Sequence, residues 1–196
     1  MELTINLIRH GKTKAIEKNL YNGLEDIDIT RKGRKELRSF RDLYPKADYY
    51  FCGELKRCVN SLKLIYPDTE FTIVPELNEQ NLGKLDMFSF DAIKNIPAYA
   101  KWISDRTGDI KCPGGGESLN DFKLRTQLNF HKLIRPFIAD LEKDTSLSII
   151  THGSVIAVIM ESAFRNKKTL KGWQPEPGRG YKLLYQKGNF RGYEVL

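Results

Sequence analysis

The stretch Leu7-Ile8-Arg9-His10-Gly11-Lys12-Thr13 closes an apolar run that begins at Leu3. A second stretch, Ile149-Ile150-Thr151-His152-Gly153-Ser154, has the same form: an apolar segment, then histidine, then glycine. Open α/β sheets present reactive side chains in this way, where a strand ends and the chain turns into a helix. The whole chain holds only three histidines. Two of the three, His10 and His152, each follow an apolar segment and precede a glycine. This shared pattern predicts that they lie close together at the carboxyl edge of a sheet.

Apolar runs and amphipathic segments alternate along the rest of the chain. We expect strands over residues 3–9, 49–52, 71–74, 147–151, 181–186 and 190–195. Helical spacing groups Leu37 with Phe40 and Tyr44, groups Leu55 with Val59 and Leu62, and continues from Glu117 to Ile138 and over 155–164. This alternation predicts an α/β fold, a three-layer sandwich with a mostly parallel central sheet and helices on both faces.

Residues from about 85 to 116 are less regular. They include Pro97, Pro113 and three consecutive glycines, and long irregular segments in compact domains commonly serve a functional site. We interpret 85–116 as a small cap within a single domain over 1–196, because 196 residues with 40% hydrophobic content suit one sizeable core. Gly188-Asn189 predicts a hairpin between the last two strands.

Composition argues against several classes of protein. No apolar run approaches the ~18 residues of a membrane span, and the residues after Met1 do not resemble a signal peptide. The three cysteines form no CxxC pair, which favours a reduced, cytoplasmic setting. Neither His10 nor His152 has a ligand-spaced partner, so we expect no metal and no cofactor. Nothing indicates an oligomer.

The formal charge of +7 comes from Lys and Arg residues spread beside acidic ones, as on an ordinary solvated surface. We therefore expect no nucleic-acid partner, since no stripe of basic and aromatic residues is present. The alternative is that the excess charge steers small phosphorylated molecules toward the protein.

Arg9, His10 and Gly11 together suit phosphoryl chemistry. A histidine can attack phosphorus and form a phosphoramidate, and an adjacent arginine can hold the phosphoryl oxygens. Gly11 lets the backbone approach an anion closely. A single Arg-His-Gly tripeptide would more simply be a hydrogen-bonded histidine beside a surface charge. The second element, Thr151-His152-Gly153, favours phosphoryl chemistry because it repeats the context.

These motifs resemble the histidine phosphatase superfamily, the phosphoglycerate-mutase-like enzymes. The family's motifs occur in its order at residues 7–13, at Tyr21-Asn22-Gly23 with Asp26, Ile29-Thr30 and Gly33, at Glu54-Leu55-Lys56-Arg57 (the S-x-L-x-R-A motif), at Leu77-Asn78-Glu79 with Gly83, at residues 113–118 and at Thr151-His152-Gly153. Tyr99, Trp102 and residues 113–118 and 173–180 are similar to the bacterial α-ribazole-phosphatase-like branch.

The resemblance implies a role for each matched residue. His10 becomes phosphohistidine, and Glu79 protonates the leaving oxygen. Arg9, Arg57 and a protonated His152 bind the phosphoryl group and stabilise its charge. Asn22 and Gly23 join them in substrate binding. Glu76 is the alternative acid, and motif spacing favours Glu79. For residues outside the motifs we expect plainer roles: Glu117 and Ser118 start a helix, His131 is structural, and Tyr99 and Trp102 pack a core or form a pocket wall.

Some positions depart from the family pattern. Ile16 stands where the family often has a phosphate-contacting Asn, and Asn19 and Asn22 are the candidates to replace it. Cys52-Gly53 stands in place of the usual Ser before the Arg57 motif, and Leu85-Asp86-Met87 replaces an aromatic-x-Gly.

The expected function is hydrolysis of small phosphomonoesters by a metal-independent phosphatase, through a phosphohistidine intermediate. The alternative is a phosphoglycerate-type mutase, which the short chain disfavours. An alternative of another class is a catalytically silent module that binds a phosphorylated ligand. The presence of both Arg9 and His10 argues against that module.

Overall fold

The computed structural model describes residues 1–140, 142–164 and 168–196. Its centre is a six-stranded sheet with the order β3-β2-β4-β1-β5-β6. The strands are β1 (Leu3–Arg9), β2 (Tyr49–Cys52), β3 (Thr72–Ile73), β4 (Thr145–Thr151), β5 (Gly180–Gln186) and β6 (Asn189–Val195). The strand prediction is therefore confirmed, with small differences at the ends.

Strand β1 lies between β4 and β5. It pairs in parallel with β4, with Leu7 opposite Ile149 and Arg9 opposite Thr151, and it pairs antiparallel with β5. Strand β2 is parallel to both β3 and β4. The sheet is thus mostly parallel, as predicted. The two His-Gly steps follow neighbouring strands at the same edge.

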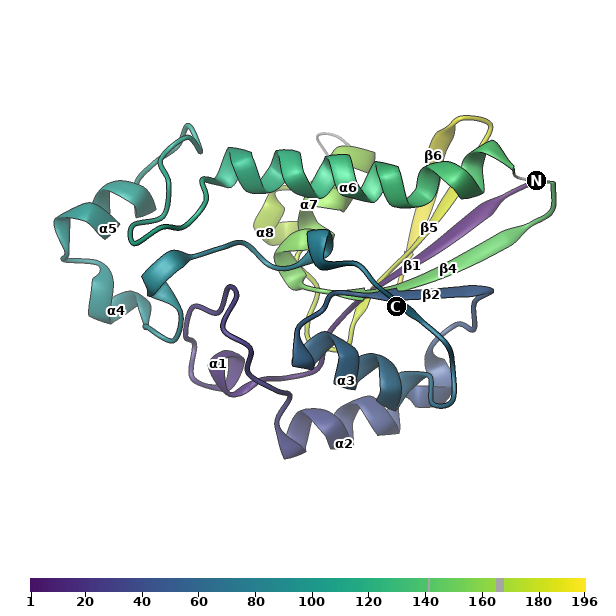
Figure 1. The fold of residues 1–196 in the computed structure, drawn as a ribbon, viewed down its shortest axis with the longest axis horizontal. Helices are drawn as coiled ribbons and strands as arrows, with labels where there is room; N and C mark the ends of the chain where they lie inside the picture. The colour runs from purple at the N-terminus through teal and green to yellow at the C-terminus, as the bar shows by residue number, and fades with distance from the viewer. Residues whose placement is uncertain (141, 165–167) are drawn as a thin grey trace.

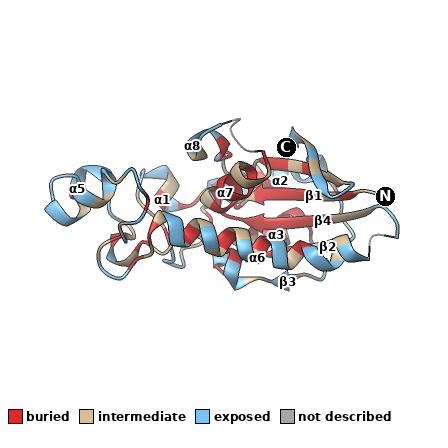
Figure 2. Ribbon diagram, turned by 90° about the horizontal axis from the view of Figure 1, so that it is seen from above, coloured by how far each residue is buried: buried red, intermediate tan, exposed pale blue. Residues whose placement is uncertain are grey.

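Helices cover both faces of the sheet (Figure 1), which confirms the three layers. On one face lie α6 (Leu119–Ala139), α7 (Gly153–Ala163) and α8 (Leu170–Trp173), and on the other lie α2 (Arg31–Ser39) and α3 (Lys56–Ile65). Each face has its own apolar core: Phe122, Phe130 and Ile156 belong to one, and Leu37 and Leu62 to the other. Figure 2 shows β1 and β4 buried between them.

The short helices α1 (Lys14–Glu17), α4 (Phe90–Ile93) and α5 (Pro97–Ile103) lie beyond the carboxyl ends of the parallel strands (Figure 1). The segment around α4 and α5 has a small core of its own, in which Tyr99 and Trp102 pack against Leu85, Ile93 and Cys112. Its place above the sheet edge is the one expected of a cap. The division into one domain with a cap at 85–116 stays a prediction.

Two local predictions were wrong in detail. Helix α2 ends at Ser39, so Phe40 and Tyr44 do not extend it, and a 3-10 turn follows over Arg41–Leu43. Pro45 disfavours a helical conformation at the residue before it, and Tyr44 is buried because its hydroxyl donates to the Gly178 carbonyl at 2.8 Å.

The predicted hairpin between β5 and β6 is confirmed, but its turn is Lys187-Gly188 rather than Gly188-Asn189. Both turn residues have positive φ, 50° and 82°, as a two-residue type I′ turn requires.

Helix α6 starts after Ser118, which accepts a hydrogen bond from the Asp121 N–H, and it continues past Pro136 to Ala139. In the part of the chain that the structure describes, no helix is both long and apolar enough to cross a lipid bilayer.

Candidate active site

A cavity of about 310 Å³ opens at the carboxyl end of β1. Five predicted site residues line it: Arg9, His10, Asn22, Arg57 and Glu79. The sixth, His152, lies directly behind His10, with the ring centroids 5.2 Å apart and the rings edge to face. The parallel pairing of β1 with β4 brings the two together, since the His10 N–H donates to the Thr151 carbonyl at 2.9 Å.

The seventh predicted residue, Gly23, lies behind the cavity rather than on its surface. Its N–H donates to Asp86, and its carbonyl accepts from Arg57 at 2.6 Å. A Cβ at this position would lie 2.4 Å from the Gln80 carbonyl oxygen. Gly23 therefore lets two loops approach closely and orients Arg57.

The His10 imidazole is held in its neutral form. Its Nδ1 lies 2.8 Å from the Gly11 carbonyl oxygen. A carbonyl only accepts, so Nδ1 carries the proton and Nε2 has the free lone pair. Burial, with the positive charges of Arg57 and Arg9, holds the His10 pKa well below its ordinary value of 6.5. Nε2 of His10 is therefore unprotonated near neutral pH.

His152 is fully buried and also neutral before a phosphoryl group arrives. Arg57 Nε donates to its Nδ1 at 3.3 Å, which leaves the ring proton on Nε2. Burial and the Arg57 charge hold the His152 pKa well below 6.5. This differs from the expected imidazolium, because two neighbouring guanidiniums disfavour a third positive charge. Positive charge in the site comes from Arg9 and Arg57.

Arg57 is fixed almost completely by the protein. Besides His152, its guanidinium donates to the carbonyls of Glu25 at 2.8 Å and Gly23 at 2.6 Å. A guanidinium has five N–H donors, so two remain for a ligand. Arg57 is only 1% exposed, and it is the second residue of α3.

Arg9 is held less completely. It donates from Nη1 to the Pro175 carbonyl at 2.7 Å. Its Nε is buried and has no hydrogen-bond partner in the part of the chain described here. Buried donors almost always have a partner, so an anion seated against this guanidinium completes the site.

Glu79 and Glu76 have different surroundings although they share a loop. Glu79 lines the cavity, and burial raises the pKa of its carboxyl above the ordinary 4.5, although the Gln80 N–H at 2.9 Å and the two guanidiniums partly oppose this. Glu76 is exposed and does not line the cavity. Of the two carboxyl groups, only that of Glu79 therefore faces the cavity.

The phosphate-contacting Asn of the family has no direct replacement. Ile16 lines the cavity with an apolar side chain. Asn22 also lines it, and its Nδ2 donates one of its two N–H groups to the Glu25 carbonyl at 3.1 Å. Asn19 does not line the cavity and has a positive φ of 52°. Of the two candidate replacements, only Asn22 therefore has a donor that faces the cavity.

Sequence reasoning missed several residues of the site. Ser154 and Gln174 line the cavity, and only the position of Ser154 after His152-Gly153 could have signalled it. Trp102 both lines the cavity and packs in the cap core, so both expected roles apply to it. Glu117 lies outside the cavity, and its carboxylate pairs with Arg125 at 2.7 Å.

Cys58 is a further contact that motif matching missed. It stands where the S-x-L-x-R-A motif has alanine, and its Sγ lies 3.4 Å from Nε2 of His152. Gly53 stands where the motif has serine, and a Cβ there would lie 3.3 Å from the same nitrogen. Asn78 accepts the neighbouring Glu54 N–H at 3.2 Å. Because Gly53 replaces the serine of the motif, the Cys58 thiol is the side chain that contacts His152 Nε2.

We expect Cys58→Ala to lower kcat about fivefold, because His152 loses its Nε2 partner and one neutral hydrogen bond is worth about that factor. Cys58→Ser should recover most of the loss, since it keeps a hydrogen-bonding group at the position that contacts Nε2. Cys52→Ala, at a buried cysteine that ends β2 shortly before α3, is the matched control. An unchanged kcat in Cys58→Ala, with the same Tm, would show that His152 needs no partner there.

Comparison with known proteins decides the family. The model of the histidine phosphatase superfamily (branch 1) matches residues 5–192. The chain belongs to this superfamily. Its members include both phosphatases and mutases, so the chain is placed among enzymes of phosphoryl transfer.

Relatives of both kinds are found. The chain is 31% identical over 189 residues to a 2,3-bisphosphoglycerate-dependent phosphoglycerate mutase of Beijerinckia indica, covering 91% of this chain and 89% of that protein. It is 28% identical to an adenosylcobalamin/alpha-ribazole phosphatase of Salmonella typhimurium, covering 79% and 76%. A putative alpha-ribazole-5'-P phosphatase from Escherichia coli has the same fold, with a TM-score of 0.83 at 20% identity over 99% of this chain and 95% of that one.

Proposed function

We propose that this protein is a phosphatase that hydrolyses small phosphomonoesters through a phosphohistidine on His10. The observation that carries the proposal is the hydrogen bond from His10 Nδ1 to the Gly11 carbonyl, which leaves Nε2 unprotonated. Arg9 and Arg57 line the same cavity. Positioning and positive charge around the phosphoryl oxygens are what this transfer needs most.

In the first step the lone pair of His10 Nε2 forms a bond to phosphorus, and the ester P–O bond breaks. The leaving oxygen takes the proton of the Glu79 carboxyl and departs as an alcohol. The phosphoryl oxygens lie against Arg9 and Arg57, and His152 holds the Arg57 guanidinium in place by accepting its Nε–H.

In the second step a water attacks phosphorus, and the P–N bond breaks. The water gives its proton to the Glu79 carboxylate, which restores the acid, and inorganic phosphate leaves. We propose that neither step needs a metal, because Arg9 and Arg57 supply the positive charge.

The second candidate is a phosphoglycerate mutase, favoured by the 31% identity to one. Chain length does not separate the two activities, because the match covers 89% of that mutase. The cavity lining favours the phosphatase. A phosphoglycerate carries a carboxylate in addition to its phosphate, and Arg9 and Arg57 are the only cationic residues found to line the cavity in the described structure.

We expect phosphate release to exceed isomerisation with monophosphoglycerates, and an aryl phosphate to be turned over at mildly acidic to neutral pH with a chelator present. The measurement follows free phosphate and the two phosphoglycerate isomers in one reaction mixture with EDTA. Isomerisation faster than release would establish the mutase. Loss of all activity in EDTA, restored by a divalent metal, would overturn the metal-free mechanism. Binding of phosphate without turnover of any ester would show that the protein is a catalytically silent module that binds a phosphorylated ligand.

A further inference from the structure

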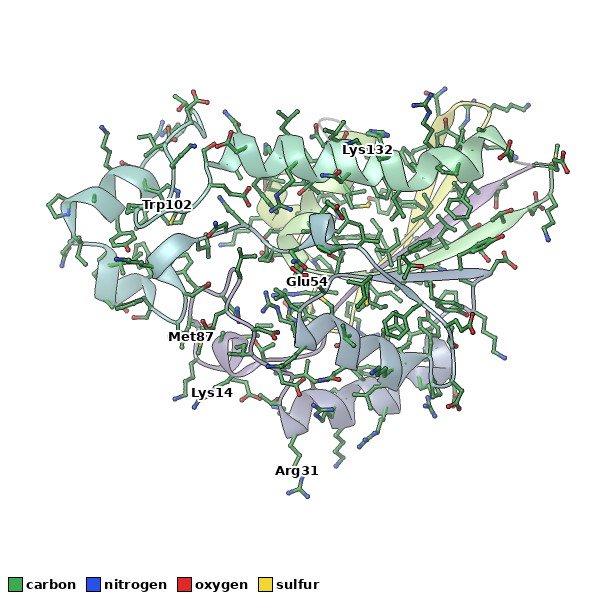
Figure 3. The ribbon with its side chains drawn as sticks, viewed as in Figure 1. Lys14, Arg31, Glu54, Met87, Trp102 and Lys132 are labelled. Atoms are coloured by element: carbon green, nitrogen blue, oxygen red, sulfur yellow. The ribbon has the colours of Figure 1, made fainter. Side chains whose placement is uncertain are left out.

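The cavity has an apolar wall that the phosphoryl chemistry does not use. Ile16 and Leu20 come from α1 and the turn after it, Leu82 comes from the loop after Glu79, and Trp102 comes from α5. Tyr21 completes the wall, with its ring edge-on to Trp102 at 6.1 Å between centroids. Figure 3 shows Trp102 at the far end of the molecule from the N-terminus, beyond the carboxyl ends of the parallel strands.

The wall is held in place by the packing of the cap. Trp102 and Tyr21 are partly buried and pack against Leu82, Leu85, Ile93 and Cys112, which are all buried. Leu82 is 7% exposed. Aromatic rings that are already fixed lose little conformational freedom when a flat group packs on them. The wall is therefore suited to bind part of a ligand.

The charges of the lining argue in the same direction. Both cations of the described lining, Arg9 and Arg57, belong to the phosphoryl site, and the remaining polar side chains, such as Gln80 and Gln174, are neutral apart from Glu79. A second acidic group on the substrate would meet no positive charge there. An uncharged apolar group would gain the contact with Tyr21 and Trp102.

We propose that the substrate is the phosphomonoester of an uncharged alcohol that carries a flat aromatic group. The phosphoryl group lies against His10 and the two arginines, and the aromatic group packs against Tyr21 and Trp102. The proposal rests on the phosphatase function proposed above, and it names the chemical class that the site selects.

The first experiment compares three primary alkyl phosphates: 2-phenylethyl phosphate, ethyl phosphate and 3-phosphoglycerate as the acidic case. Phenylethyl and ethyl phosphate are both primary alkyl esters, so they require the same chemistry of His10 and Glu79. The difference between their kcat/KM values therefore measures the contribution of the apolar wall. We expect kcat/KM to be about 30-fold higher for phenylethyl than for ethyl phosphate, mostly through KM. Equal values for the two, or a preference for 3-phosphoglycerate, would overturn the proposal.

Variants connect this preference to the wall. Trp102→Ala should reduce the phenylethyl-to-ethyl ratio about tenfold. Phe90→Ala removes an aromatic ring that is 49% exposed on α4 and does not line the cavity, so it should leave the ratio unchanged. If Trp102→Ala does not fold, Tyr21→Leu should reduce the ratio while Tyr21→Phe keeps it. A ratio unchanged in both Trp102→Ala and Tyr21→Leu would contradict the assignment.

A binding measurement separates this proposal from the phosphatase function. Benzylphosphonate and methylphosphonate cannot be hydrolysed at a P–O ester bond, and calorimetry gives their Kd without turnover. Tighter binding of benzylphosphonate, with no phosphate released from any ester, would support the wall and reject the phosphatase. Phosphate release without any aromatic preference in rate or binding would support the phosphatase and reject the wall.

Discussion

Replacing His10 by alanine is expected to lower kcat by about 10⁴-fold or more and to abolish the phosphoenzyme. The variant lacks the nitrogen that attacks phosphorus, and the loss of a covalent nucleophile has effects of this size. The wild-type enzyme, mixed rapidly with a radioactive phosphate ester and quenched, should carry a label that is stable in alkali and labile in acid. His10→Ala should carry none.

Two other histidines supply the comparison. His152→Ala should still be labelled, but much more slowly, because His152 assists the transfer without forming a bond to phosphorus. His131→Ala, at an exposed position on α6, should behave as wild type. A label on His152 instead of His10 would reverse the two assigned roles.

The second large effect concerns Glu79. An alkoxide leaves poorly, so an alkyl ester needs a proton as its bond breaks, whereas nitrophenolate leaves without one. A positioned acid contributes about 10²–10⁴-fold to such a step. Glu79→Gln should therefore lower kcat on alkyl phosphates by about that factor and on nitrophenyl phosphate far less.

The pH profile gives the same test an independent readout. The reaction needs neutral His10 and protonated Glu79, but their ordinary pKa values, 6.5 and 4.5, are in the opposite order. Burial lowers the pKa of His10 and raises that of Glu79, which moves both groups toward the required forms. The acid limb of kcat/KM should therefore lie below pH 6.5. The alkaline limb, where Glu79 loses its proton, should disappear in Glu79→Gln.

Glu76→Gln is the matched control, three residues away and exposed. It should change neither the alkyl rate nor the alkaline limb. Equal losses on both kinds of substrate in Glu79→Gln would mean that the residue binds or orients without donating a proton. A defect confined to alkyl esters in Glu76→Gln would move the acid to that residue.

The fold was predictable because its signals are local. A strand buried on both faces is mostly apolar, and the strands before the two His-Gly steps contain the apolar pairs Leu7-Ile8 and Ile149-Ile150. The early end of α2 was less predictable, since Phe40 and Tyr44 continue the helical spacing, whereas the chain changes to a 3-10 helix over Arg41–Leu43 and the Tyr44 hydroxyl donates to the Gly178 carbonyl. The spacing of apolar residues in the sequence shows neither a change of helix type nor a contact with a distant residue.

The candidate site divides in the same way. Arg9, His10, Arg57 and Glu79 follow motifs, and the structure brings them to one cavity. The apolar wall and Cys58 do not follow motifs, because they depend on which loops approach one another. Trp102 reaches the cavity only through the placement of α5, and nothing near it in the sequence indicates phosphoryl chemistry.

The position of β1 in the sheet has a consequence for how the protein is made. β1 leaves the ribosome before both of its neighbours, β4 and β5, which follow only after β2, β3 and helices α1 to α6. Until they emerge, a strand with five buried residues among its seven has no pairing partner. Contacts between such distant segments form slowly, and unpaired apolar strands aggregate. The nascent chain should therefore depend on chaperones late into synthesis, and ribosome-bound chains that stop before β4 should have no phosphatase activity.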